Sequence, residues 1–267
     1  RINLGTEIQA SSEIKKIAQA FGAGLVGITS YDKRWEYSNK YSDMSLKSYP
    51  PEIPYTLSNV IVIAQPMDYE LIKTVPSALS GSATGLGYSH DALTVLSLTQ
   101  YIRNLGYEAI GSMNDTSLAI PYAIKAGLGE YGRNGLLITK KFGPRVRLGK
   151  IYTNLPLKHD KPIKFGVKEF CNICNLCAKA CPVKAIPETL PSEKTYNISN
   201  ISGVKKWSVD GEKCFSFWTS QNSDCSICIR VCPYNKDYSK WIHKVGLKLA
   251  STWLRHIMLW LDVNLGY

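Results

Sequence analysis

Histidine is scarce in this sequence, which has only His90, His159, His243 and His256 among 267 residues. The sequence therefore offers few histidines for a hydrolase built on a Ser/His or Cys/His pair. Cysteine is absent from residues 1–170, so any metal binding by thiolates belongs to the later part of the chain. The sequence has no run of about 18 or more apolar residues, so we predict no membrane-spanning helix.

The ends of the chain also lack familiar signals. The sequence begins at Arg1 without methionine and without a charged and then apolar leader, so we expect a processed protein or an excised portion. Residues 244–263 are basic and apolar, with a helical pattern. Such a segment can lie on a membrane surface, and the alternative is a terminal helix packed on its own domain.

Two dense runs hold all eight cysteines. The first run, followed by Pro182, reads CxxCxxCxxxCP, the spacing with which thiolates surround a 4Fe-4S cluster. In two-cluster ferredoxins the fourth cysteine of such a run binds the other cluster. We therefore predict two 4Fe-4S clusters with crossed ligation, which act as electron carriers because every ligand position is filled by cysteine. The predicted ligand sets are Cys171, Cys174, Cys177 and Cys232 for one cluster, and Cys214, Cys225, Cys228 and Cys181 for the other.

Two other uses of the cysteines fit the sequence less well. Four disulfides are typical of small domains that lack a core, whereas this chain is long and 45% hydrophobic. Structural zinc takes four ligands in two pairs and has no use for a third cysteine in the run. The net charge of +11 favours acidic surfaces, nucleic acid or anionic lipid as partners, but part of it can balance the negative clusters.

The apolar pattern before the cysteines predicts an α+β fold. We expect helices over 12–21, 89–105 and 120–126, and strands over 23–29, 59–64, 107–110, 136–139 and 146–153. The short connection near 140–146 suggests antiparallel pairing of the last two strands. The domains predicted from these features are a catalytic core at 1–165, a two-cluster module at 166–236 and a helical segment at 237–267.

Three residues of the core are candidates for chemistry. Tyr88 follows the small-residue run 77–87, which we expect to open space, and it shares a helical face with Ala92, Val95, Leu96 and Thr99. Its buried phenol is either a proton donor or a hydrogen-bonded core tyrosine. Arg147, on a predicted strand, would favour the tyrosinate if it lies nearby. Asn114 belongs to a turn signal, and forming that turn is the alternative to a catalytic role.

Gly127, Gly129 and Gly132 spell GxGxxG, but the context of a dinucleotide site is missing. The triplet follows a helical pattern, leads into a strand, and has no acidic residue about 20 positions later. We interpret it as a tight loop that lets the backbone approach a cofactor or another strand closely.

Taken together, these segments resemble the corrinoid-dependent reductive dehalogenase family (tetrachloroethene reductive dehalogenase-like). The resemblance runs from about Lys16 to Tyr267. It is carried by AGLVGIT with YDKRWEYS, SATGLGYS, GLGEYGRNGLLIT, KFGPRVRLGKIYTNLPL, KFGVKEFC, SFWTS, DCSICIRVCPYNK and the terminal LGY.

The resemblance implies a nitroreductase-like corrinoid-binding core joined to a two-cluster ferredoxin-like module. The corrinoid would be of the cobalamin type and bound base-off, with Tyr88 as proton donor and Arg147 and Asn114 beside it. The matching pocket positions are Thr84, Trp218 and Trp35, and the implied corrinoid contacts are Ser89, Gly132, Arg133 and Asn134.

The same resemblance implies a small organohalide as substrate and organohalide respiration as the setting. It implies a small membrane-anchor protein as partner and a place on the outer, periplasmic face of the cytoplasmic membrane, with no nucleic acid as ligand. The electron donor stays unknown, and a homodimer is left open. The twin-arginine leader and the long N-terminal region of such enzymes are missing before Arg1, so we expect a trimmed chain.

Two alternatives remain. Epoxyqueuosine reductase, a tRNA-modifying enzyme, has a related corrinoid core and two-cluster module, and the charge of +11 would suit RNA. That family relies on a carboxylate acid where this sequence offers Tyr88. A non-catalytic ferredoxin-type electron shuttle is the other alternative, and it leaves residues 1–165 unexplained.

Overall fold

The computed structural model describes residues 1–42 and 44–266, and the chain divides into two compact units. Unit 1 comprises Arg1–Pro66, Leu86–Leu128 and Val146–Ile163. Unit 2 comprises Met67–Gly85, Gly129–Arg145 and the chain from Lys164 onward. The predicted division treated 1–165 as one uninterrupted core. In the structure, two segments of that range belong instead with the cysteine-containing unit, and so does the predicted C-terminal segment 237–267, whose last residue lies outside the described residues.

An antiparallel four-stranded sheet forms the centre of unit 1. Its order is β1 (Leu25–Ser30), β4 (Asn59–Pro66), β8 (Val146–Thr153) and β5 (Ala109–Ser112). β4 pairs with β8 over its whole length, so that Gln65 lies opposite Arg147. Since successive side chains on a strand point to opposite faces, residues 147, 149 and 151 of β8 share one face, and residue 150 lies on the other.

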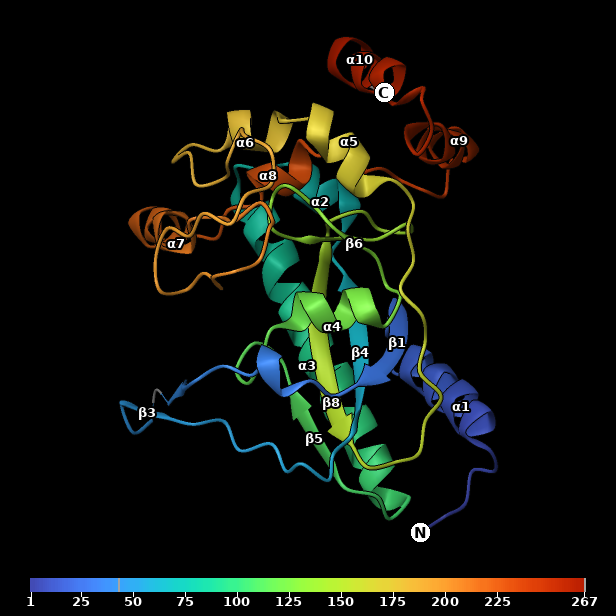
Figure 1. Cartoon of the computed structure of the whole chain (residues 1–267). Coiled ribbons are helices and arrows are strands. Elements are labelled where there is room, and N and C mark those ends of the chain that lie inside the picture. Colours follow the sequence, from blue (N-terminus) through green and yellow to red (C-terminus); the bar gives the residue numbers. More distant parts are fainter. Residues whose placement is uncertain (43, 267) are drawn as a thin grey trace. The chain divides into compact units, whose positions relative to one another are not determined.

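Helices cover both faces of this sheet (Figure 1). On one face, α1 (Glu7–Ala20) and α3 (Ala78–Asn104) contribute Ile14 and Leu98 to a core with Ile61 and Ile151 of the strands. On the other face lies α4 (Ala119–Lys125). The backbone of α4 comes so close to β1 that a side chain at Gly27 would collide with the carbonyl oxygen of Ala126.

Two features of α3 differ from the prediction. The helix predicted from residue 89 already begins at Ala78, so the small-residue run 77–87 is almost wholly helical. The buried face was predicted in part: Val95 and Thr99 are buried, whereas Leu96 is 67% exposed. The packed face also includes Asp91, which is 1% exposed and was not predicted there.

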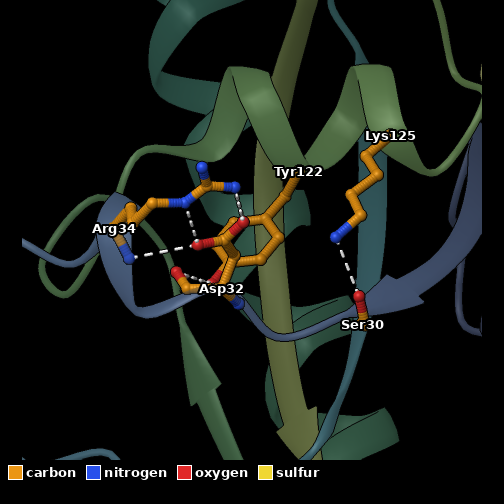
Figure 2. Close-up of polar contacts among 5 residues, drawn as sticks. All are labelled: Ser30, Asp32, Arg34, Tyr122 and Lys125. Carbon is orange, nitrogen blue, oxygen red and sulfur yellow. Dashed lines mark hydrogen bonds and ion pairs between the residues drawn. The ribbon is translucent and has the colours of Figure 1, made fainter.

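The segment 31–55, expected to be irregular, contains three short elements. They are the 3-10 helix η1 (Lys33–Trp35) and the antiparallel pair β2 (Lys40–Ser42) and β3 (Lys47–Tyr49). Figure 2 shows how α4 anchors the start of this segment: the Tyr122 hydroxyl donates to the Asp32 carbonyl oxygen at 3.0 Å and accepts from the Asp32 amide at 3.1 Å. Lys125 donates to Ser30 at 2.8 Å, also from α4.

Unit 2 is mostly helical. Its helices are α2 (Tyr69–Lys73), α5 (Val167–Ile173), α6 (Leu176–Ala180), α7 (Gly211–Ser220), α8 (Ile227–Arg230), α9 (Trp241–Ala250) and α10 (Arg255–Leu265). The strands β6 (Glu130–Tyr131) and β7 (Leu137–Ile138) pair with each other. The expected hairpin between β7 and β8 is therefore wrong, although β8 is antiparallel to both of its neighbours. No helix in the described part of the chain is long and apolar enough to cross a membrane.

The glycine triplet makes close backbone approaches, as its sequence suggested. A side chain at Gly129 would collide with the carbonyl oxygen of Ile138 on β7. Gly127 has a φ of +74°, a conformation that glycine adopts without strain. The loop approaches another strand at Gly129, one of the two options that the sequence left open.

We predict that Tyr122→Phe lowers the free energy of unfolding of unit 1. Tyr122 is fully buried, and the change leaves the Asp32 amide and carbonyl without their partner. Such a loss costs about 1–3 kcal/mol. The measurement is urea denaturation followed by circular dichroism, with Tyr41→Phe as control because Tyr41 is 61% exposed. Equal denaturation midpoints for the two variants would contradict the prediction.

Candidate functional site

Unit 2 brings four cysteines from both runs together around one cavity. Cys171 lies on α5, Cys174 ends that helix, Cys177 lies on α6, and Cys232 comes from the second run. All four line the same cavity, together with Arg133, Asn134, Ile138, Phe170, Pro233 and Tyr234. The meeting of Cys232 with three cysteines of the first run is the arrangement that crossed ligation requires.

The other four cysteines form a second group within the same unit. Cys177 and Cys181 belong to a small buried core, against which Cys214 and Cys228 pack. Nearby Cys225 and Cys181 both raise the pKa of Cys214, after the larger effect of burial. Cys181 of the first run therefore lies among cysteines of the second run.

The thiols sit where an isolated thiolate is unfavourable. Burial raises the pKa of Cys171 and of Cys177 to about 12 and raises that of Cys232 strongly. Buried free cysteines in such surroundings suit ligands whose charge is neutralised by bound iron. Within residues 1–42 and 44–266, no three Cys, His, Asp or Glu side chains converge as the ligands of a single metal ion do.

Arg133, which resemblance had assigned to the corrinoid, binds the loop of the first cysteine run. Its Nε and Nη2 donate to the Cys171 carbonyl oxygen at 3.2 and 2.7 Å, and Nε also donates to that of Cys174 at 2.9 Å. Its Nη1 donates to the carbonyl oxygens of Pro187 and Thr189 at 2.8 and 2.7 Å. The guanidinium also lies over the Trp207 ring, and the residue is 2% exposed. These contacts make Arg133 a support of the cysteine loop.

Unit 1 presents a smaller polar group at Tyr88. The Asn114 Nδ2 donates to the Tyr88 hydroxyl at 3.2 Å, and the Arg147 Nη1 lies 3.5 Å from the same oxygen. The Arg147 guanidinium also lies 4.5 Å from the centre of the Tyr88 ring. The structure thus brings together the three candidate catalytic residues from α3, from the turn after β5 and from β8.

The sequence analysis missed two buried charged residues on the same elements, Asp91 of α3 and Lys150 of β8. Asp91 follows Tyr88 by one turn of α3 and is 1% exposed, and Lys150 of β8 is fully buried. Lys150 donates to the Met113 carbonyl oxygen. Burial raises the pKa of Asp91 to about 6 and lowers that of Lys150 to about 8. The available signal was a lone carboxylate directly before the mostly apolar stretch ALTVLSL and a lysine in the middle of a strand.

The other predicted residues lie in varied surroundings. Trp35 packs edge-on against Tyr122 with ring centres 4.7 Å apart. Thr84 is buried with its hydroxyl 4.0 Å from the Met67 sulfur. The Trp218 indole N–H is buried without a well-formed hydrogen bond, and its weaker interaction with Cys214 opposes the effect of burial on that thiol's pKa. The substrate-pocket role of these residues stays a prediction.

Of the predicted corrinoid contacts, Ser89 is exposed on α3. Gly132 accepts from the Gly135 amide at 3.0 Å in the turn between β6 and β7. Asn134 lines the first cysteine cavity, and its buried Nδ2 has no partner among the described residues. Gly132 and Asn134 thus belong to the same loop as Arg133, and their corrinoid contact stays a prediction.

Comparison with known proteins first defines the class. Residues 170–235 match the family described as a 4Fe-4S double cluster binding domain. The chain therefore carries a two-cluster iron-sulfur domain, with the individual cysteine assignments resting on the grouping described above.

The rest of the chain defines the family. Residues 39–157 match the family described as reductive dehalogenase subunit. A tetrachloroethene reductive dehalogenase of Desulfitobacterium hafniense is 41% identical over 277 aligned residues, which cover 89% of this chain and 50% of that protein. A catabolic reductive dehalogenase solved with 3-bromo-4-hydroxybenzoic acid matches 98% of this chain and 37% of its own, with a TM-score of 0.85 and 26% identity. The chain belongs to the reductive dehalogenase family, a family of oxidoreductases.

Two further findings limit what these matches say. The chain spans about half the length of the curated relatives it matches. An epoxyqueuosine reductase of Lactococcus garvieae is 29% identical over 149 residues, which cover 49% of this chain and 36% of that protein. The sequence likeness to that second family is thus weaker and covers about half of this chain.

We predict that Cys181→Ser damages the cluster of the second group. Cys181 lies among Cys214, Cys225 and Cys228, so its loss should leave the cluster bound by Cys171, Cys174 and Cys177 more intact. The measurement is paramagnetic resonance of the reduced, anaerobically reconstituted protein, and the reciprocal control is Cys232→Ser. Loss of the first-group signal in Cys181→Ser would show that ligation is not crossed.

We also predict that Arg133→Gln weakens iron retention. The change leaves several carbonyl oxygens of the cysteine loop unpaired, at a cost of about 1–3 kcal/mol for each one that stays buried. Iron and sulfide release to a chelator should therefore be faster, while Arg133→Lys, which keeps the charge, should be intermediate. Arg103→Lys is the matched control, since Arg103 donates to one carbonyl oxygen in unit 1. Release at the wild-type rate from Arg133→Gln would contradict the assigned support role.

Proposed function

We propose that the protein catalyses reductive dehalogenation of a small organohalide, with a corrinoid as the reacting cofactor and two 4Fe-4S clusters as its electron supply. The observation that carries this proposal is the Tyr88 hydroxyl held between Asn114 Nδ2 and Arg147 Nη1. It is supported by membership of the family and by the double-cluster domain.

The donor set of unit 1 fits the needs of a corrinoid reaction. When bound, a corrinoid of the cobalamin type would supply a cobalt centre that, once reduced, donates electrons to the carbon–halogen bond. The protein must then provide a proton and stabilise the charge that the proton leaves behind. A phenol flanked by an amide donor and a guanidinium meets both needs. The proposal includes a nitroreductase-like fold for the corrinoid-binding core.

Tyr88 is the proposed acid. Its O–H proton replaces the departing halide on the substrate carbon, and its oxygen becomes a phenolate. The Arg147 guanidinium, 4.5 Å from the ring centre, stabilises that negative charge. Asn114 holds the hydroxyl oxygen in place through the hydrogen bond from its Nδ2.

The cysteine groups suggest an order for the proposed electron supply. The first group of four has three buried cysteines, whereas Cys214, Cys225 and Cys228 are only partly buried. A cluster held by the second group would therefore be the more accessible entry point for electrons, and a cluster held by the first group would be the more enclosed one. The donor is a reduced carrier outside this chain.

Membrane attachment is a further part of the proposal. Trp241 of α9, Trp253 in the turn after that helix and Trp260 of α10 are exposed, with basic residues nearby in the sequence. Such a surface suits either an anionic membrane surface or a small membrane-anchor protein, on the periplasmic side.

We predict that Tyr88→Phe lowers the dehalogenation rate by about 10²–10⁴, the usual cost of losing a positioned acid. The change keeps the ring against Arg147 and removes only the hydroxyl, so corrinoid and iron content should survive. The measurement is halide release from halogenated alkenes with a reduced viologen donor. Arg147→Leu should cause a comparable loss.

The control is Tyr107→Phe, since Tyr107 also contacts an arginine, Arg1, but lies outside the Tyr88 group. Near-wild-type turnover by Tyr88→Phe with cofactors intact would return Tyr88 to the role of a structural tyrosine. Turnover of epoxyqueuosine-containing tRNA, without turnover of any organohalide, would favour the more distant family instead.

A further inference from the structure

We propose that Asp91 is the internal acid that returns a proton to Tyr88 after each turnover, through water held between α3 and the β4–β8 strands. This inference rests on the proposed function, because it concerns the regeneration of the proposed proton donor. Asp91 acts through Tyr88 and does not touch the substrate.

The position of Asp91 is set by helix geometry and by a missing side chain. Asp91 follows Tyr88 by three residues on α3, so both side chains lie on the same face of the helix. Across from it, a side chain added at Gly149 of β8 would lie 2.7 Å from Asp91 Oδ1 and would also collide with Val95. Glycine at this position therefore lets the carboxyl group rest directly on the strand, beside Arg147 on the same face.

Three buried polar atoms of this region have no hydrogen-bond partner among the described residues. They are Asp91 Oδ1, Arg147 Nε and Gln65 Oε1. Gln65 lies opposite Arg147 in the strand register, so their side chains share one face of the sheet. Gly149 lies on the same face, and Asp91 of α3 packs over it. Buried polar groups are almost always paired with protein or with ordered water. Water is the one small group that can accept from Arg147 and donate to both oxygens.

The surrounding charges keep the carboxyl group able to exchange a proton. Burial raises the pKa of Asp91 to about 6, and the cations Lys150 and Arg147 oppose that rise. On the side of β8 that carries Lys150, Asp115 after β5 compensates the lysine charge. On its own helix Asp91 has Tyr88 one turn earlier, and His90 is exposed. Because its pKa is raised in this way, a larger fraction of Asp91 is protonated near neutral pH than of an exposed aspartate.

The proton count closes over one turnover. The organohalide takes two electrons, supplied through the clusters, and one proton from Tyr88, and yields the reduced product and a halide ion. The O–H bond of Asp91 then breaks, its proton passes along the water to the Tyr88 phenolate, and a new O–H bond forms there. Asp91 regains its proton from solvent before the next turnover.

The experiment compares the first turnover with later ones in Asp91→Asn, which keeps the shape of the side chain and removes its acid proton. The first turnover draws on the proton already on Tyr88, so its rate should stay within about twofold of wild type. Later turnovers should slow by about tenfold or more, because proton delivery then depends on a less direct route. The result is a burst of product, measured by rapid quench, that wild type does not show.

Controls separate proton delivery from structure. Asp91→Glu retains the acid and should restore part of the steady-state rate. Thr94→Val changes a residue of the same helix that is also 1% exposed, and it should show no burst. Equal slowing of first and later turnovers in Asp91→Asn would overturn the proposal.

A readout independent of activity uses infrared spectroscopy of the protein with labelled aspartate. Wild type should show the carbonyl stretch of a protonated, buried carboxylic acid that titrates around pH 6, absent from Asp91→Asn. If the variant does not fold, the wild-type titration alone decides, since no aspartic acid titrating in that range would overturn the proposal. Full activity of Tyr88→Phe would instead contradict the proposed role of Tyr88 as proton donor, whatever the infrared result.

Discussion

The constraint on which unit 1 depends is the burial of two cations by one central strand. β8 lies between β4 and β5, and it carries the partly buried Arg147 on one face and the fully buried Lys150 on the other. A buried charge is unfavourable unless it is paired or hydrogen-bonded. The Met113 carbonyl oxygen and the charge of Asp115 stabilise Lys150, and Tyr88 and Asp91 lie near Arg147. The polar residues in the turn after β5 and on the packed face of α3 thus lie near the two cations of this strand and offset their charge.

Local sequence pattern predicted the strand 146–153 and the placement of Arg147, because alternation along a strand is read from a few neighbouring residues. It also predicted the helix that carries Tyr88 and the burial of Val95 and Thr99 on it, but it placed Leu96, which is exposed, on the same face and passed over Asp91, which is buried. A carboxylate beside an apolar stretch is a weak signal by itself. The charges that favour its burial lie on β8, which is distant in sequence.

The cysteine spacing carried more information about unit 2. Crossed ligation is a regularity of two-cluster domains, and the structure groups Cys232 with the first run and Cys181 with the second. Arg133 was assigned to the corrinoid by the family resemblance. In the structure it donates to the carbonyl oxygens of Cys171, Cys174, Pro187 and Thr189, and backbone carbonyls have no signature in a sequence. The same limit applies to the segments 67–85 and 129–145, which join the cluster unit through packing alone.

Arg133 and Arg147 differ in how many hydrogen bonds their guanidinium groups make, and therefore in what each group can do. Arg133 is 2% exposed, and each of its three nitrogens donates to a carbonyl oxygen, so its charge and its geometry are fixed in support of the cysteine loop. Arg147 makes one long hydrogen bond to Tyr88 and keeps a buried Nε without a partner in the described chain. A fully bonded guanidinium can only hold its surroundings in place. One with an unused donor beside a phenol can respond when negative charge appears on that phenol, as proton transfer from Tyr88 requires.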